Sequence, residues 1–181
     1  RVEIIGKDGD LLQPGQEGEM AVHAPDPVMM LGYWNNQDAT KAKFSNGWWR
    51  MGDAAVKDEE GYFRFVGRAD DVITTAGYRV GPGEIEDCLT KHPAVSLAAA
   101  IGIPDPIRTE SIKVFIKLGD GFNGSSDLEE DIRSFVKTRL SPHEYPRTIE
   151  FVSDLPLTAT GKIRRKNLRD KEQAILAKQD A

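Results

Sequence analysis

Short apolar runs that alternate with polar residues dominate the first third of the chain. Turn residues such as Asp8-Gly9 separate these runs, and Glu59, Glu60 and Gly61 predict a hairpin tip between the last two. The predicted strands cover residues 2–5, 18–23, 48–51, 54–57 and 62–66. No helix longer than the stretch 37–43 is expected before residue 80. The pattern predicts a small antiparallel sheet or part of a barrel.

From residue 70 the pattern changes to strands that alternate with helices. Pro82 suits a first helical position, and we expect a helix over 82–92 that ends at the following proline. Asp127 is expected to cap a second helix that runs through residue 140. Strands are predicted over 94–103, 112–118 and 148–152, and a basic helix from about residue 163. Residues 70–181 therefore predict a compact α+β module.

The change of pattern falls at residues 67–71, which read GRADD, and it predicts a domain boundary there. Residues 1–69 are expected to form a β-rich slice that has few elements to cover both faces of its sheet, so it should pack on further protein. Residues 70–181 are expected to form the second domain. The chain begins within a predicted strand and without a methionine, which indicates a piece of a longer protein. The predicted fold class is α+β, a partial barrel followed by a compact α+β domain.

The composition indicates a globular protein, because 39% of the residues are hydrophobic and 29% are charged. The formal net charge of −5 argues against nucleic acid as the main partner. No apolar run approaches the roughly 20 residues of a membrane span, and the first residues lack the layout of a signal peptide. The only cysteine, Cys88, cannot form an internal disulfide, which favours a reducing compartment, and we expect a cytoplasmic location.

Two glycine motifs suggest nucleotide binding but fail in detail. Gly119, Gly121 and Gly124 match G-x-G-x-x-G, but Asp120 places a negative charge in the loop and the next helix is expected to begin only after the glycines. We interpret this segment as a surface loop. Gly161-Lys162 lacks the remaining residues of a Walker loop, yet a flexible loop that carries a lysine can still present a cation to an anion.

Two further chemistries are not favoured by the sequence. The basic run KIRRKNLRDK could contact nucleic acid, but its interleaved acid and the net charge favour a solvated helix face. The three histidines are scattered and no His and Cys cluster has the spacing of metal ligands, so no metal site is predicted among these residues.

Four segments, in this order and spacing, carry a family resemblance. They are WWRMGDAAVKDEEGYFRFVGRADD, TTAGYRVGPGEIE, YPRTIEFVSDLP and LTATGKIRR. Together they resemble the C-terminal part of the adenylate-forming (ANL) superfamily, which includes acyl-CoA synthetases, luciferases and the adenylation domains of peptide synthetases. The upstream GEMAVHAPDPVMMLGYWN is similar to the segment that precedes them there. DPIRTES together with EYPRTIEF most resembles the medium-chain acyl-CoA synthetases.

The resemblance implies an acid–thiol ligase that works in two steps. A carboxylate first attacks the α-phosphate of ATP, in the presence of magnesium, to give acyl-adenylate and pyrophosphate. The CoA thiolate then attacks the acyl carbon and AMP leaves. A large ATP-binding domain and a mobile C-terminal lid share this work in the family. The family's ATP phosphate loop and its magnesium segment have no counterpart in residues 1–181.

The resemblance assigns nucleotide and activation roles to three residues. Lys162 matches the lysine whose ammonium neutralises charge on the carboxylate and the α-phosphate during adenylation. Asp53 matches the acid that accepts hydrogen bonds from the ribose hydroxyls. Arg68 matches a second nucleotide contact. For Asp53 and Arg68 a hairpin turn and a surface ion pair are the structural alternatives.

Other implied roles belong to the movement of the lid and to CoA. Asp70 matches the hinge, and Gly77 matches a glycine whose bare backbone lines the tunnel for the CoA thiol. Arg79 is assigned to nucleotide phosphate, while Glu84 is expected to hold the following helix. Lys137, near the end of a predicted helix, is a candidate for the CoA phosphates. Strand-end turns and structural ion pairs remain alternatives for these residues.

The function predicted from these residues is that of the C-terminal part of an ATP-dependent acyl-CoA synthetase, inactive on its own. Its expected partners are a carboxylic acid, ATP, CoA and the remaining N-terminal domain. An adenylation domain that loads a carrier protein would share Asp53, Arg68 and Lys162, although no carrier-like serine motif follows. A non-catalytic module that keeps the lid fold is the third alternative, and the intact Asp70, Gly77 and Lys162 argue against it.

Overall fold

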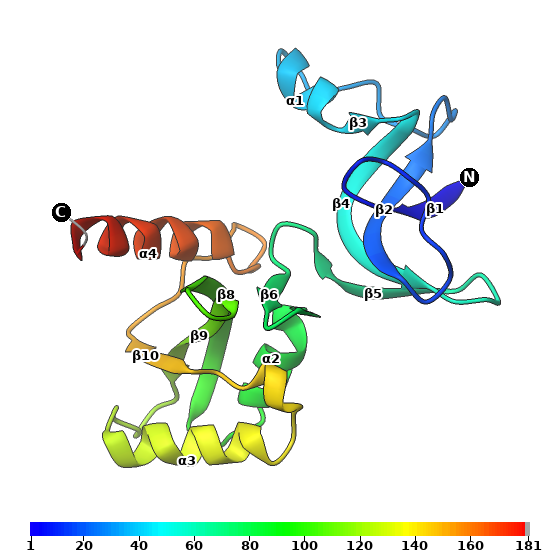
Figure 1. The fold of residues 1–181 in the computed structure, drawn as a ribbon. Helices are drawn as coiled ribbons and strands as arrows, with labels where there is room; N and C mark the ends of the chain where they lie inside the picture. The colour runs from blue at the N-terminus through cyan, green and yellow to red at the C-terminus, as the bar shows by residue number, and fades with distance from the viewer. Residues whose placement is uncertain (180–181) are drawn as a thin grey trace. The chain divides into compact units, whose positions relative to one another are not determined.

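The computed structural model describes residues 1–179 and divides into two compact units, Arg1–Asp70 and Asp71–Ala181 (Figure 1). The first unit is made mainly of strands, and the second combines one sheet with helices. The predicted α+β class, with a partial barrel followed by a compact α+β domain, is confirmed.

The first unit is a curled antiparallel sheet. Its elements are β1 (Val2–Ile5), β2 (Glu17–His23), α1 (Gln37–Ala42), β3 (Phe44–Ser45), β4 (Trp48–Lys57) and β5 (Phe63–Arg68). The strand order is β1-β2-β4-β3, and β5 pairs with the other half of β4. Figure 1 shows β4 as the long curved strand of this sheet. Ile5, Ala21 and Trp48 form a small buried core cluster in this unit.

The curvature of β4 corrects one sequence expectation. Residues 48–51 and 54–57 were expected to form separate strands, but β4 runs through both. Gly52, between them, adopts a φ of 84°, and the pairing with β5 shifts register between Ala54 and Ala55. A left-handed glycine and an irregular register bend a strand without ending it. The predicted hairpin tip before β5 is confirmed, with Gly61 N donating to Asp58 O at 3.2 Å.

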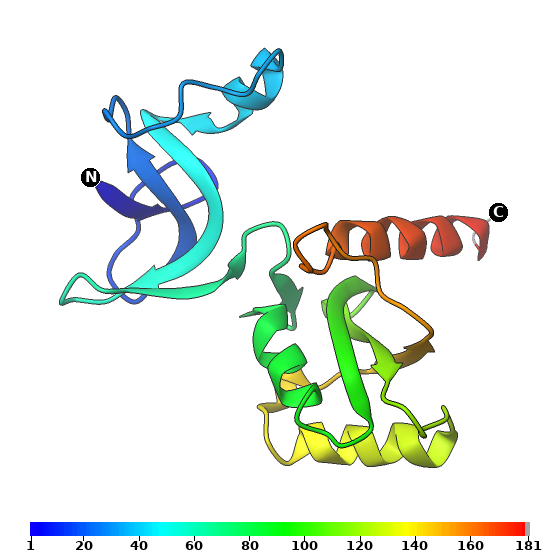
Figure 2. The same ribbon diagram turned by 180° about the vertical axis from the view of Figure 1, so that it is seen from behind.

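The second unit has a sheet covered on both faces. Its elements are β6 (Ile73–Thr75), β7 (Tyr78–Val80), α2 (Pro82–Leu89), β8 (Val95–Asp105), β9 (Thr109–Leu118), α3 (Ser126–Lys137), the 3₁₀ turn η1 (Pro142–Glu144), β10 (Thr148–Val152) and α4 (Arg165–Gln179). β9 pairs antiparallel with β8 and parallel with β10, and its start meets β6 at Thr109↔Thr75. Figures 1 and 2 show α3 on one side of this sheet and α4 on the other.

Strand alternation explains how both faces acquire a core. Along β9, Val114 and its alternate neighbours pack with α2 and α3, whereas Phe115 packs with Leu168 of α4. In β8, Ala98 and Ala100 face the first cluster and Ala99 the second. Successive strand residues point to opposite faces, so a strand buried on both faces becomes a continuous apolar run. This is the pattern that predicted β8 and β9 from sequence.

The helix boundaries differ from the expected ones by a few residues. α2 ends at Leu89 rather than at residue 92, because the chain turns at Thr90 and His92 accepts a hydrogen bond from Ala94 N. α3 is capped by Ser125, whose hydroxyl accepts from Leu128 N, and not by Asp127. α3 ends at Lys137 rather than at residue 140. Since the helix starts after Gly124, the glycine motif before it lies in a loop, as expected.

The basic helix α4 was expected to present a solvated face, and this is partly wrong. Lys166 is 78% exposed, but Arg165 is only 18% and Arg169 only 22% exposed. Both arginines form ion pairs with Asp71, and Arg165 also pairs with Glu86 of α2. A periodic basic run does not reveal which of its members turn inward, because that depends on acids that are distant in sequence. α4 begins at Arg165, two residues later than expected.

Candidate functional site

The predicted nucleotide residues Asp53 and Arg68 lie opposite each other on neighbouring strands. Asp53 of β4 is the register partner of Arg68 at the end of β5. The Arg68 Nη1 donates to Asp53 Oδ1 at 2.7 Å. Both side chains are partly exposed. An ionised carboxylate can accept several hydrogen bonds, so Asp53 can bind ribose hydroxyls while Arg68 holds it in place.

A hollow of about 500 Å³ adjoins this pair. Gly52 N donates to Glu19 Oε1 at 2.9 Å, and Glu19 also pairs with Arg50 at 2.8 Å. A Cβ on Gly52 would lie 2.7 Å from an Arg68 nitrogen and 3.1 Å from Lys43 Nζ. The φ of 84° at Gly52 favours glycine, and a Cβ there would push these flexible cation ends away from the backbone beside Asp53. Glu19, Lys43 and Arg50 were not predicted, because nothing local to their strands links them to Asp53.

Asp70, the predicted hinge, is the last residue of the first unit. Its Oδ1 lies 3.7 Å from Arg68 Nε. The preceding Ala69 N donates to Gly52 O at 2.9 Å, so the sheet contacts continue up to this point. The division of the chain after Asp70 lies one residue beyond the predicted boundary. The hinge role of Asp70 stays a prediction.

Lys162 lies on an exposed and well-held turn of the second unit. Leu157 and Ile163 form an isolated antiparallel bridge, and Thr158 N donates to Lys162 O at 2.8 Å. Lys162 N in turn donates to Thr158 Oγ1 at 3.0 Å. Gly161 makes the turn possible with a φ of 81°. The structure thus fixes the backbone on both sides of Lys162 and leaves its ammonium exposed.

Gly77 lies at the tip of the hairpin between β6 and β7. Ala76 and Gly77 have φ values of 49° and 84°, and Thr75 pairs with Tyr78 across the turn. Two left-handed residues in succession make a two-residue hairpin whose second position favours glycine. Among the described residues no heavy atom lies within 4 Å of a Cβ built on Gly77. The backbone conformation explains this glycine, while its role toward CoA stays a prediction.

Arg79 and Glu84 occupy the two elements that follow this turn. Arg79 lies in β7 opposite Thr74 and is exposed. Glu84 lies in the first turn of α2, where a carboxylate interacts favourably with the helix dipole. This position fits the structural role expected of Glu84. The phosphate role of Arg79 stays a prediction.

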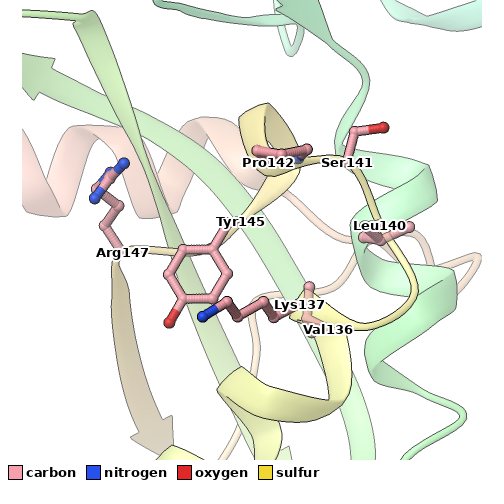
Figure 3. A pocket seen from close by; sticks show the side chains of 7 residues that line it. All are labelled: Val136, Lys137, Leu140, Ser141, Pro142, Tyr145 and Arg147. Atoms are coloured by element: carbon pink, nitrogen blue, oxygen red, sulfur yellow. The ribbon is translucent and has the colours of Figure 1, made fainter.

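Lys137 lines a pocket of about 410 Å³ at the end of α3 (Figure 3). Its other lining residues come from the last turn of α3, from the chain after it, from η1 and from the segment before β10. They are Val136, Leu140, Ser141, Pro142, Tyr145 and Arg147. Two cations and an aromatic ring therefore border one pocket, a combination that suits a phosphate-bearing nucleotide.

A smaller cavity of about 60 Å³ shares Tyr145 and Arg147 with this pocket. It is also lined by Ala76 and Arg108, and Ala76 N donates to Arg108 O at 2.9 Å. Tyr145 and Arg147 therefore lie between the Lys137 pocket and a cavity that reaches Ala76, the residue before Gly77. Sequence reasoning missed Arg108, Tyr145 and Arg147, although the segments that contain them carried the family resemblance.

No group of three or more His, Cys, Asp or Glu side chains within residues 1–179 could hold a metal ion. None of the helices in this range is long and apolar enough to cross a membrane.

Comparison with known proteins adds family information to this geometry. Residues 84–162 match the AMP-binding enzyme C-terminal domain. The chain is 44% identical to acyl-coenzyme A synthetase ACSM2B, mitochondrial, of Homo sapiens, over 98% of the chain and 32% of the relative. It is 48% identical to acetyl-coenzyme A synthetase of Bacillus subtilis (strain 168), over 92% of the chain and 29% of the relative.

A solved structure shows the same fold. The anthranilate CoA ligase AuaEII, in complex with anthranoyl-AMP, matches this chain with a TM-score of 0.82 and 33% identity. The match covers 98% of this chain and 34% of the other. The chain spans about a third of the length of the curated relatives it matches. Residues 84–162 therefore carry the AMP-binding enzyme C-terminal domain, and the chain is similar along nearly its whole length to part of the acyl-coenzyme A synthetases.

Proposed function

We propose that this chain is the C-terminal part of an ATP-dependent acyl-CoA synthetase. The complete enzyme would convert a carboxylic acid, ATP and CoA to acyl-CoA, AMP and pyrophosphate through an acyl-adenylate. The alignment with acyl-coenzyme A synthetases along 98% of the chain supports this proposal. The anthranoyl-AMP in the similar anthranilate CoA ligase supports the adenylate intermediate.

The observation that carries the proposal is the fixed, exposed position of Lys162. Its hairpin is closed by the Leu157–Ile163 bridge and by the hydrogen bond from Lys162 N to Thr158. A preorganised cation stabilises negative charge that grows in a transition state without having to reorganise first. One such donor typically contributes about 3 kcal/mol to transition-state stabilisation. Lys162 would supply this stabilisation to the carboxylate and α-phosphate oxygens.

Asp53 and Arg68 would bind the nucleotide, and Arg79 would contact its phosphate. The 2.7 Å bond from Arg68 holds the Asp53 carboxylate in one orientation, which prepares it to accept the ribose hydroxyls. Magnesium that accompanies ATP would be held mostly by the N-terminal part of the complete enzyme, together with the ATP phosphates.

CoA would bind at the Gly77 hairpin and the Lys137 pocket. The pocket offers two cations, Lys137 and Arg147, and the Tyr145 ring to the nucleotide end of CoA. The adjoining cavity leads from Tyr145 and Arg147 to Ala76, the neighbour of Gly77. A rotation at Asp70 would exchange Lys162 for Gly77 between the two steps.

A carrier protein instead of CoA as acyl acceptor is the second candidate. The relatives named as coenzyme A synthetases favour CoA.

A medium-chain carboxylic acid is proposed as substrate because of the segments DPIRTES and EYPRTIEF. Activity of the complete enzyme against a series of acids from acetate to palmitate would test this choice. A cytoplasmic location is also proposed, and cell fractionation would test it.

The division of labour is tested with Lys162→Ala in the complete enzyme. Adenylation is measured as exchange of pyrophosphate into ATP in the presence of the acid, and thioester formation from supplied acyl-adenylate and CoA. We expect adenylation to fall by about a hundredfold or more while thioester formation changes little. Lys166→Ala, which removes an exposed lysine of α4, is the matched control. Equal loss in both steps would refute the proposed role of Lys162.

A further inference from the structure

The guanidinium of Arg165 connects three elements of the second unit. Its Nε donates to Glu86 Oε1 of α2 at 3.0 Å, and its Nη2 donates to the other oxygen of the same carboxylate. Glu86 Oε1 also accepts from Ala100 N of β8 at 2.8 Å. The remaining nitrogen, Nη1, donates to Asp71 Oδ2 at 3.1 Å. One side chain at the start of α4 is thereby tied to α2, to β8 and to the first residue of the unit.

Asp71 is held from two sides by α4. Arg165 binds one of its oxygens, and Arg169, one turn later, donates to the other. The side chains of Asp71 and Glu86 are 12% and 11% exposed. A buried pair persists only when its geometry is good and its oxygens are hydrogen-bonded, which holds for both carboxylates.

These ion pairs join two segments that the proposed function uses, the residue after the hinge and the Lys162 hairpin. Asp71 directly follows Asp70, the predicted hinge, and Arg165 follows the bridge residue Ile163 that closes the Lys162 hairpin. Arg164 N also donates to Pro156 O at 2.8 Å, so the backbone is hydrogen-bonded up to the residue before α4. A short, continuous set of contacts therefore links the first residue after the hinge to the lysine loop.

Apolar contacts also hold α4 on the sheet, where Leu168 packs with Phe115 and Leu155. Replacing a buried ion pair by apolar residues is often neutral or stabilising, so such a pair is weak support for a purely stabilising role. A bidentate guanidinium, in contrast, defines direction as well as distance.

We propose that Asp71 and Arg165 are positioning residues that fix the Lys162 hairpin to the segment directly after the hinge. When the unit turns, the lysine then moves with that segment as one rigid arm and arrives at a defined place. The inference rests on the proposed function, since it needs Lys162 to act in adenylation. It assigns no direct contact with substrate to Asp71 or Arg165.

The structural half of the inference is tested on the 181-residue chain itself by amide hydrogen exchange. Arg165→Lys keeps the charge but removes the fork, and Asp71→Asn is nearly isosteric and keeps an acceptor. We expect the amides of Thr158, Gly161 and Lys162 to exchange about tenfold faster in both variants. Lys166→Gln, which breaks only the exposed pair with Asp170, should leave them unchanged. Unchanged exchange in Asp71→Asn overturns the inference, whether or not Arg165→Lys folds.

The functional half is tested in the complete enzyme with the same three variants. A misplacement of about 1 Å can cost a hundredfold in rate, so Arg165→Lys and Asp71→Asn should lower adenylation by about tenfold to a hundredfold. Thioester formation from supplied adenylate should stay within about twofold, and the double variant should lose little more than either single one. Equal losses in the two steps, or none in adenylation, overturn the inference.

A failure of the proposed function can be distinguished from a failure of the positioning role of Asp71 and Arg165. If the unchanged enzyme shows no pyrophosphate exchange with any acid, the proposed function is wrong, and the hydrogen-exchange result alone then decides whether the network holds the hairpin. If the unchanged enzyme and Lys166→Gln catalyse both steps while Arg165→Lys and Asp71→Asn behave like them, the proposed function stands and the positioning role falls.

Discussion

Arg68 donates a 2.7 Å hydrogen bond to Asp53 across the pairing of β5 with β4. These residues were assigned to the nucleotide separately, yet the strand register makes them direct neighbours. The pairing also brings Gly52 against the guanidinium, where a Cβ would have to displace the end of the Arg68 side chain. One strand position thus combines a hydrogen-bond acceptor, a cation that orients it and an unobstructed backbone.

Asp53→Ala in the complete enzyme should raise the KM for ATP. A hydrogen bond to a charged group is worth about 1.5–3 kcal/mol, which corresponds to a rise of about tenfold to a hundredfold. Steady-state kinetics with varied ATP measure it. Glu59→Ala, at the exposed hairpin tip of the same unit, is the control. An unchanged KM for ATP would contradict the nucleotide role of Asp53.

The 181-residue chain alone should not turn over. We expect no AMP release when it is incubated with ATP, magnesium, CoA and assorted fatty acids, because the family's phosphate loop and acyl pocket have no counterpart in its sequence. Chromatographic detection of AMP is the measurement, with the complete enzyme as the positive control. AMP formed by the chain alone would show that the catalytic apparatus lies within these residues.

The same substitution at two glycines should have opposite effects on stability. Gly77→Ala forces a side chain into a φ of 84° and should lower the free energy of unfolding by about 1–2 kcal/mol. Gly83→Ala lies in α2, where the new Cβ would meet no described atom within 4 Å beyond its own helix backbone and chain neighbours, and should raise it by about 0.5–1 kcal/mol. Urea denaturation of the 181-residue chain measures both. A stabilising Gly77→Ala would show that the hairpin can adopt another turn.

The ion cluster of Glu150 should make stability depend on pH. Burial acts to raise the pKa of Glu150, but hydrogen bonds from Lys113 and Lys171 outweigh it and hold that pKa below the ordinary value of 4.5. Because the folded-state pKa is the lower one, the stabilisation is present above pH 4.5 and is lost as the pH falls through the folded-state pKa.

Glu150→Gln should therefore reduce the free energy of unfolding more at pH 7 than at about pH 3. Urea denaturation of both proteins across this range is the measurement. Glu130→Gln, on the exposed side of α3, provides the control for loss of a negative charge. A difference between Glu150→Gln and the unchanged protein that stays constant with pH would mean that the cluster does not form in solution.

Much of the fold could be predicted because it depends on local patterns. The apolar runs of β8 and β9, the proline at the start of α2 and the turn before β5 identify elements whose side chains or backbone geometry are set by near neighbours. The wrong expectation for β4 also came from a local pattern. The break expected in β4 at Gly52 did not occur, because glycine can bend a strand as well as end it, and only the pairing with β2 and β5 decides between the two.

The sequence by itself determined most of the strands and helices, the resemblance to adenylate-forming enzymes, and the identity of Lys162, Gly77 and Asp53 as candidates, since motif spacing and periodicity are properties of neighbouring residues. Only the tertiary structure decided which of the arginines in α4 turn inward. Arg165 and Asp71 are 94 residues apart in sequence, and their contact depends on how the sheet brings distant segments together. Local patterns carry no information on such pairs, because the energy of an ion pair depends on the distance in space and on burial, both of which arise only on folding.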